Sequence, residues 1–501
     1  MAEETQSVQT EKDSSSYRSI FKATSLFGGL QAYQIVINVI KTKLVAILLG
    51  PAGVGISGLY TSATDLIQQI TSMGLSSSAV RNVSEAYGTG NHERVSRVVT
   101  AFRKLVWITG LLGMIAVLVL SPVLSKTSFG DSAHVVGFMI ISVTLLLSQL
   151  SSGQRVILQG TRKLKYLAKS TAIGVTIGLF LSIPLFYFFG INGIVPNIVI
   201  GYVTTLLLTT YFSRKVSIEN VPMTTREVFL EGKSMLTMGI AMSLTHVFAS
   251  LISYALRGFI RAQGGVEDVG IFTAGYQLMN QYTGLVFTAM ITDFYPRLSA
   301  VNTDNEKCRD MVNKQAEVGL LILAPMMAVC IIFISVVVRL LFSEAFLAVN
   351  DYIIWCAVGI LFKMASFAIG YILLAKAESK LFLITETISS AVTFCLNILG
   401  YYFFGLIGLG IASALGFLFY MLMIYFIAKK RYEFRYSSSF VKMFCQEFLV
   451  ILLCVACVYL LPMLYRYIVG SVLIAFTLYM SFRELNKRMN LTSFVKSKIK
   501  K

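Results

Sequence analysis

The chain contains, at residues 315–341, the stretch QAEVGLLILAPMMAVCIIFISVVVRLL. Its uncharged middle is about as long as the roughly 20 apolar residues that an α-helix needs to cross the hydrocarbon of a bilayer. Similar stretches recur along the whole chain, which is 56% hydrophobic and only 14% charged. Because soluble domains carry about a quarter charged residues, the sequence predicts a membrane protein and excludes soluble, fibrous and disordered classes.

Apolar stretches of this length can be drawn at about fourteen places. About twelve or thirteen are the alternatives, because the last stretch is short and the junction before it, around Pro462 and Arg466, is poorly defined. They cover residues 25–49, 52–75, 105–124, 135–158, 168–190, 192–213, 235–259, 268–292, 315–341, 352–375, 381–403, 405–428, 444–463 and 467–482. The connections between them are too short for an independent domain. The predicted fold class is therefore an all-α polytopic membrane protein.

The basic residues indicate an orientation. Lysine and arginine number 43 against 25 acidic residues, which gives a net charge of +18. They lie in short clusters between the apolar stretches rather than on one solvated domain, which argues against a nucleic-acid partner. With the N-terminus inside, most of them fall on the cytoplasmic side, as the positive-inside rule requires. We therefore predict that both termini are cytoplasmic and that the number of spans is even.

Two sequence blocks recur at one interval of 215 positions. Val54-Gly55-Ile56 recurs as Val269-Gly270-Ile271, and Tyr187-Phe188-Phe189-Gly190 recurs as Tyr402-Phe403-Phe404-Gly405. Six predicted spans lie within one interval, so the two halves share their orientation and are related by an axis along the membrane normal. We predict two parallel-related six-helix bundles, helices 1–6 and 7–12, around a central cavity, with two further C-terminal helices.

This division gives six segments. They are a polar cytoplasmic N-terminus (1–17), an N-terminal six-helix bundle (18–213), a cytoplasmic linker (214–234), a C-terminal six-helix bundle (235–430), helices 13 and 14 (431–485) and a basic cytoplasmic tail (486–501).

Polar side chains form stripes at helical spacing on corresponding spans of the two halves. Steps of three and four place one stripe of the seventh span on a single helix face; it consists of Ser243, His246, Ser250, Ser253, Arg257 and Arg261. The first span carries the matching stripe of Gln31, Gln34, Asn38 and Lys41, flanked by Lys43. At the repeat interval Gln31 falls on His246, Asn38 on Ser253, and Asp65 of the second span on Asn280.

Two interpretations apply to these side chains. Serine, asparagine and glutamine commonly hydrogen-bond between packed membrane helices, and lysine or arginine near a helix end can reach the interface, as at Lys41, Lys43, Arg257 and Arg261. Lys363 differs, because it lies about 16 Å from either end of its span. We expect Lys363 to face a cavity, with a buried ion pair as the alternative.

The sign of the charges predicts the cargo. Several cations stand against one clear intramembrane carboxylate, Asp65. This balance favours an anionic head group such as a phosphate or diphosphate. Glu386 is expected to pair with Lys380 or Lys376. The seven cysteines, including the Cys454 and Cys457 pair, lie in or next to apolar stretches without regular spacing, so we expect no metal and no redox site.

Four motifs resemble the O-antigen and enterobacterial lipid III flippases of the multidrug/oligosaccharidyl-lipid/polysaccharide exporter superfamily. They are Gly50-Pro51-Ala52-Gly53-Val54-Gly55, Glu267-Asp268-Val269-Gly270-Ile271, Tyr295-Pro296-Arg297-Leu298 and Gly370-Tyr371-Ile372-Leu373-Leu374-Ala375-Lys376-Ala377. The resemblance covers roughly residues 18–430, so it leaves out the last two helices.

The resemblance implies a bacterial inner-membrane flippase, and not an enzyme, that moves undecaprenyl-diphosphate-linked oligosaccharide from the cytoplasmic to the periplasmic leaflet by alternating access. Its implied partners are this cargo, membrane lipids, and the polymerase and chain-length proteins of polysaccharide synthesis. The superfamily further implies coupling to a proton or sodium gradient and no bound cofactor. The titratable candidates here are Asp65, His246 and Glu386.

Other functions remain as alternatives. A multidrug or cation antiporter of the same superfamily is one, although cationic drugs favour an acidic cavity. A lipid II flippase of peptidoglycan synthesis is another. An enzyme of lipid-linked sugars would need a sizeable outer loop with catalytic groups, and the outer loops predicted here are short.

Overall fold

The computed structural model describes residues 2–489, without the side chains of residues 2–28, 32, 241, 292, 293 and 489. The basic tail predicted at 486–501 therefore lies mostly outside the described residues. Within residues 2–489 the regular elements are all helical, which confirms the predicted fold class. The chain forms two compact units, Met1–Gly258 and Phe259–Lys501. The predicted segment boundaries stay a prediction.

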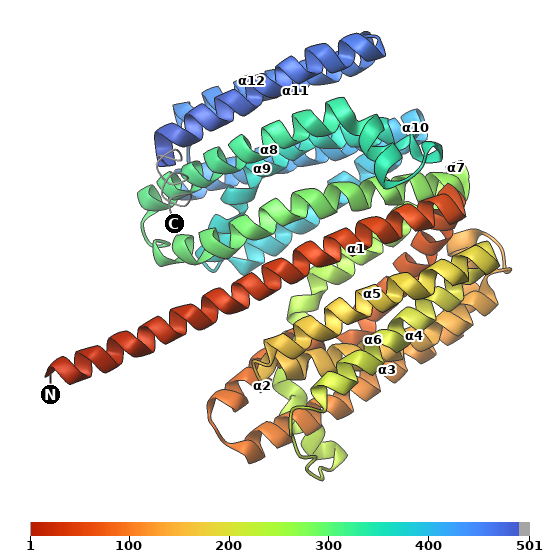
Figure 1. Ribbon diagram of the computed structural model, residues 1–501, viewed down its shortest axis with the longest axis vertical. Helices are drawn as coiled ribbons and strands as arrows, with labels where there is room; N and C mark the ends of the chain where they lie inside the picture. Colours follow the sequence, from red (N-terminus) through yellow and green to blue (C-terminus); the bar gives the residue numbers. More distant parts are fainter. Residues whose placement is uncertain (1, 490–501) are drawn as a thin grey trace. The chain divides into compact units, whose positions relative to one another are not determined.

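The first unit contains seven helices and the first part of another (Figure 1). They are α1 (Ala2–Ser72), α2 (Leu75–Gly88), α3 (His92–Phe129), α4 (Val135–Gly160), α5 (Leu164–Phe189), the short η1 (Gly190–Gly193), α6 (Ile194–Ser213) and the part of α7 (Thr225–Ala300) up to Gly258. In Figure 1, α3 to α6 lie side by side. The Ser78 hydroxyl of α2 donates a 2.7 Å hydrogen bond to the Met235 carbonyl of α7.

The second unit contains the rest of α7 and the C-terminal helices. These are α8 (Asn305–Leu341), the short η2 (Glu344–Phe346), α9 (Val349–Ala375), α10 (Ser379–Tyr432), α11 (Ser438–Leu460) and α12 (Met463–Met489). Helix α8 packs against α9, α11 and α12, and α9 packs against α10. The central place of α8 fits its apolar sequence, whose side chains are buried along most of the helix.

Glycine sets the sharp turns inside the long helices. The backbone leaves the helical conformation at Gly50 (φ 63°), Gly265 (φ 85°) and Gly405 (φ 61°). A positive φ costs glycine little because it has no Cβ. Gly50 and Gly265 fall between two of the predicted spans, and Gly405 is the first residue of the twelfth, so each of α1, α7 and α10 consists of two helices that meet at a glycine.

The number of membrane crossings is a separate question. Within the described part of the chain, nine helices are long and apolar enough to cross a membrane, or ten if the bent pair Thr225–Ile240 and Met242–Ala300 counts as one span. This count treats Leu164–Ser213 and Ser379–Tyr432 as one helix each, although they have 50 and 54 residues. About 20 residues suffice for one crossing. The predicted count of fourteen therefore stays a prediction, which these lengths permit.

The backbone repeats at the interval found in the sequence. Gly50 and Gly265 have φ values of 63° and 85°, and Gly190 and Gly405 have φ values of 51° and 61°. Non-glycine residues with positive φ are uncommon, yet Arg162 and Ala377, at the same interval, have φ values of 57° and 58°. The two halves therefore share their turns as well as their sequence blocks.

Candidate functional site

Lys363 lies in the middle of α9, the most buried of the candidate spans. Its ammonium nitrogen lies 5.1 Å from the ring centroid of Phe287 on α7 and 5.2 Å from that of Phe417 on α10. An ammonium group over an aromatic face gains about 0.5–2 kcal/mol, depending on its hydration. Two rings thus contact the cation, and among the described residues its N–H groups have no hydrogen-bond acceptor, which leaves them available to an anion.

Among the described residues, no carboxylate forms an ion pair with Lys363. The alternative of a buried ion pair at Lys363 is therefore not observed there. Glu386 of α10 is close enough to Lys363 for an electrostatic interaction. Its carboxylate accepts a 2.6 Å hydrogen bond from the Tyr420 hydroxyl. The pairing expected for Glu386 with Lys376 or Lys380 is wrong for the described residues: Lys376 donates instead to the Asn302 carbonyl, because the turn after α9 points it there.

The first unit has its own charged group, centred on Arg257 of α7. Only 8% of Arg257 is exposed. Its guanidinium donates to the Ser253 carbonyl, at 3.3 Å, and to the Ser253 hydroxyl one helical turn away. Asp65 of α1 interacts electrostatically with Arg257. The stripe predicted from helical spacing therefore holds at these positions, since a step of four joins Ser253 to Arg257.

The remaining predicted residues differ in exposure. Half-buried side chains are Gln34, Lys41, Lys43, Ser250 and Arg261. Exposed side chains are Gln31, Asn38, Asp65, His246 and Asn280. Exposed polar groups in a membrane protein face water, head groups or neighbouring polar surface, because hydrocarbon cannot satisfy them.

The predicted residues fall into both compact units. Lys363, Glu386, Asn280 and Arg261 lie in Phe259–Lys501, and the others lie in Met1–Gly258. Each unit brings together its own small charged group. A single cavity lined by all of them stays a prediction.

Four contributing residues were not predicted. Phe287 and Phe417 flank Lys363, and Tyr420 holds Glu386. In the first unit Tyr202 of α6 interacts electrostatically with Asp65. The repeat contained one usable signal, because Tyr202 and Phe417 are separated by the repeat interval. Aromatic residues are so common in apolar helices that composition alone could not select these four.

Comparison with protein families gives one match to most of the chain. The model of the family described as "Polysaccharide biosynthesis protein" matches residues 44–351. The matched region begins directly after Lys43 and includes Asp65 and Arg257. It ends at the start of α9, so Lys363 lies outside it.

Two curated relatives and two solved structures are similar over most of their lengths. The lipid III flippases of Escherichia coli (strain K12) and Shigella flexneri are each 21% identical over 379 residues, which is 74% of this chain and 88% of the relative. The lipid II flippase MurJ in an inward closed conformation has a TM-score of 0.65 at 16% identity and covers 92% of this chain and 99% of its own. An inward-facing multidrug resistance MATE family transporter of the MOP superfamily has a TM-score of 0.60 at 17% identity, with 80% and 94% covered. At these identities the two structures establish the fold alone.

Proposed function

This multi-pass membrane chain belongs to the polysaccharide biosynthesis protein family, and within it we propose that the chain is a flippase for lipid-linked oligosaccharide. Two relatives that are flippases of a lipid-linked molecule support this proposal. The likeness in fold to a lipid II flippase and to a MATE transporter supports a carrier that works by alternating access.

The proposed cargo is an undecaprenyl-diphosphate-linked oligosaccharide, such as the repeat unit of O-antigen or a similar surface polysaccharide. The chain carries it from the cytoplasmic to the periplasmic leaflet of the bacterial inner membrane, with both of its own termini in the cytoplasm. The sugar diphosphate crosses through protein while the prenyl tail stays among membrane lipids. The polymerase and chain-length proteins then take up the cargo.

Lys363 carries this proposal. It is a cation in the middle of a long apolar helix, and no described carboxylate neutralises it by an ion pair. Charged residues at this depth are expensive and usually functional. An incoming diphosphate would accept hydrogen bonds from the ammonium group while the two aromatic rings keep it in position.

The other candidate residues have supporting roles. Arg257, Arg261, Lys41 and Lys43 attract and hold the diphosphate. Hydrogen bonds to the sugar hydroxyls come from neutral polar side chains; these are Gln31, Gln34, Asn38, Ser250, Ser253 and Asn280. Phosphate groups accept several charge-assisted hydrogen bonds, whereas sugars exchange neutral ones, which matches this mixture of cations and polar side chains.

Two sources of free energy can drive the movement. With the cytoplasm negative, each negative charge that moves outward gains about 2.3 kcal/mol per 100 mV. A proton or sodium gradient can add to this through Asp65, His246 or Glu386. Of these residues, Glu386 accepts a hydrogen bond from Tyr420, and Asp65 interacts electrostatically with Arg257. A change in the charge of either carboxylate therefore changes its interaction with that neighbour.

Reconstituted vesicles test the proposal. Purified protein should expose labelled undecaprenyl-diphosphate oligosaccharide to an enzyme outside the vesicle. Vesicles with Lys363→Met and vesicles without protein are the controls. Extrusion of cationic dyes with no movement of the lipid-linked sugar would establish the multidrug alternative. Movement of lipid II in preference to longer oligosaccharides would establish the peptidoglycan alternative.

Depletion in cells identifies the sugar. If the chain is depleted, its cargo should accumulate in the cytoplasmic leaflet, and mass spectrometry of extracted lipids should detect it. Normal amounts of every lipid-linked oligosaccharide after depletion would contradict the proposed cargo class.

A further inference from the structure

Glu447 is a buried carboxylic acid in α11, outside every motif discussed above. Only 3% of its surface is exposed, and its Oε2 atom is fully buried without a hydrogen-bond partner among the described residues. The helix around it is apolar and long enough to cross a membrane. A carboxylic acid in this environment needs either a partner or a proton.

The helix face that carries Glu447 packs inside the second unit. The buried side chains of α11 recur at helical spacing and include Met443, Glu447, Ile451 and Cys454. Helix α11 packs mainly against α8 and α12. The carboxyl group of Glu447 therefore lies on the stripe that the other helices cover rather than on the lipid side.

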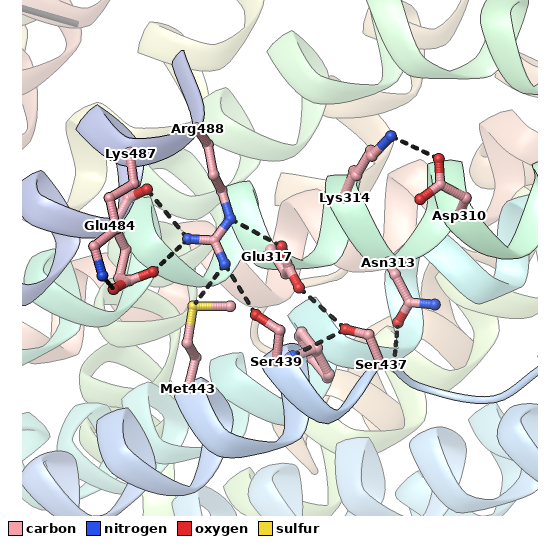
Figure 2. Close-up of polar contacts among 11 residues, drawn as sticks. Asp310, Asn313, Lys314, Glu317, Ser437, Ser439, Met443, Glu484, Lys487 and Arg488 are labelled. Atoms are coloured by element: carbon pink, nitrogen blue, oxygen red, sulfur yellow. Dashed lines mark hydrogen bonds and ion pairs between the residues drawn. The ribbon is translucent and has the colours of Figure 1, made fainter. Parts of the chain in front are cut away.

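The charged groups near this stripe lie at the beginning of α11 and are already engaged (Figure 2). On α8, Glu317 accepts from the Ser437 hydroxyl at 3.1 Å and pairs with Arg488 of α12 at 3.1 Å. Arg488 also pairs with Glu484 at 2.7 Å. Further ion pairs there, Lys487 with Glu484 and Lys314 with Asp310, lie at the exposed ends of α12 and α8.

Arg488 is thus saturated by groups other than Glu447. Its remaining contacts are the Glu484 carbonyl at 3.1 Å, the Ser439 hydroxyl at 3.0 Å and the Met443 sulfur at 3.7 Å. Met443 stands one helical turn before Glu447, so the cation stops one turn short of the buried acid. We call Glu317, Ser437, Ser439, Glu484 and Arg488 the α8–α12 cluster; it separates Glu447 from the exposed helix ends.

A second buried polar atom lies at the depth of Glu447. The contact between Arg488 and Ser439 fixes the register of α11 and α12, which a short connection makes antiparallel. From this contact Glu447 is about 12 Å along α11 and Ser481 about 10 Å along α12. The Ser481 hydroxyl oxygen is also buried without a partner among the described residues. The Cys454 thiol, on the same stripe as Glu447, is a titratable group that interacts with it electrostatically.

We propose that Glu447 is a proton-binding site in the C-terminal helix pair and that it holds a proton in the conformation described here. An ionised carboxylate buried without a cation or donor is far more costly than a neutral acid. A proton removes the charge without any new contact. The site needs no particular cargo, so it stands apart from the proposed transport of lipid-linked sugar.

The α8–α12 cluster provides a way for this proton to leave. If Arg488 gives up Glu317, its guanidinium is one turn from Glu447 and can compensate a carboxylate there. Separation of α11 from α8 at this end would also admit water. Proton release at Glu447 is then linked to the movement of these three helices.

Infrared difference spectroscopy on the purified full-length protein tests the site. At neutral pH the wild-type spectrum should contain a carbonyl band of a protonated carboxylic acid that Glu447→Gln lacks. Glu484→Gln is the matched control, since this acid is ion-paired and its loss should leave the band unchanged. The proposal is wrong if wild type and Glu447→Gln differ only in a carboxylate band.

A second variant covers the case in which Glu447→Gln does not fold. Glu447→Asp keeps a carboxylic acid on a shorter side chain, so a band that belongs to position 447 should shift in frequency. An unchanged band would overturn the proposal. Neither measurement uses transport, so a failed flipping assay would leave this result intact, and a failed infrared assay would leave the cargo proposal intact.

Discussion

The guanidinium of Arg488 on α12 lies 3.1 Å from the carboxylate of Glu317 on α8, with 27% and 9% of the two side chains exposed. This ion pair fastens the last helix, which lies beyond the region of family resemblance, to the helix at the centre of the second unit. Its low exposure distinguishes it from the ion pairs at the helix ends, which solvent screens.

Removal of Arg488 should destabilise the protein measurably. Arg488→Ala leaves Glu317 without its cation, and we expect a loss of about 1–3 kcal/mol, as for other buried groups that lose a charged partner. Thermal unfolding in detergent measures the change. Lys314→Ala is the control, because the Lys314–Asp310 pair is 72% and 62% exposed and should contribute less than about 0.5 kcal/mol. Equal effects of the two substitutions would contradict the assigned role.

Substitutions of Lys363 separate transport from stability. Lys363→Ala should abolish flipping, and Lys363→Arg should retain part of it, since the charge persists in a broader group. The loss of stability in Lys363→Ala should stay near 1 kcal/mol, because the described contacts are two aromatic rings rather than an ion pair. Vesicle transport and thermal unfolding are measured together. Full transport by Lys363→Met at normal expression would end the claim that this cation binds the cargo.

Gly405 should not tolerate a side chain even though space is open around it. A Cβ atom there would meet no atom within 4 Å, but φ is 61°. Gly405→Ala should therefore cost about 1–3 kcal/mol through backbone strain alone. Gly201 in α6 also has open space but a helical backbone, so Gly201→Ala should stabilise by up to about 1 kcal/mol. Thermal unfolding measures both variants. A lower unfolding temperature for Gly405→Ala and a higher one for Gly201→Ala would confirm the prediction, and a change in the same direction for both would contradict it.

Asp304 gives the start of α8 a dependence on pH. Hydrogen bonds from the backbone N–H groups of Lys307 and Glu306, with the Lys307 ammonium at 3.2 Å, lower the pKa of this carboxyl. Asp304 is the N-cap residue of α8. Because the pKa of its carboxyl is lower in the folded than in the unfolded chain, the ionised carboxylate stabilises the fold fully above about pH 4, and this stabilisation is lost as pH falls through the lowered pKa. Asp304→Asn should unfold at a temperature that changes less between neutral and acidic pH. A variant with the wild-type acid dependence would exclude Asp304 as its source.

The orientation can be tested with reporter fusions. A phosphatase that is active only in the periplasm should be inactive when fused after Lys501, and a cytoplasmic reporter should be active there. We expect this because most of the 43 basic residues fall on the side of the termini. Phosphatase activity after Lys501 would overturn the orientation or the even number of spans.

The sequence predicted the elements better than the contacts between them. Hydropathy identified the long apolar helices because the bilayer requires long apolar stretches, but it missed α2 (Leu75–Gly88), which is only 14 residues long. It also separated the two helices that meet near Gly50, Gly265 and Gly405, where the backbone leaves the helical conformation.

The site was predicted in part for a related reason. Helical spacing assigns a residue to a face, so it placed Ser253 beside Arg257. It does not identify the side chain opposite that face on another helix. The aromatic rings around Lys363 and the tyrosine that donates a hydrogen bond to Glu386 lie on such neighbouring helices. A single sequence does not show which helices pack together, so it could not identify these residues.

The two halves share backbone torsion angles at positions where their residues differ. Arg162 and Ala377 have nothing in common chemically, yet both keep a left-handed backbone with φ values that differ by one degree, 57° and 58°. The torsion angle is thus nearly the same in both halves although the residue differs. An alignment of one half on the other is therefore best anchored at these turns.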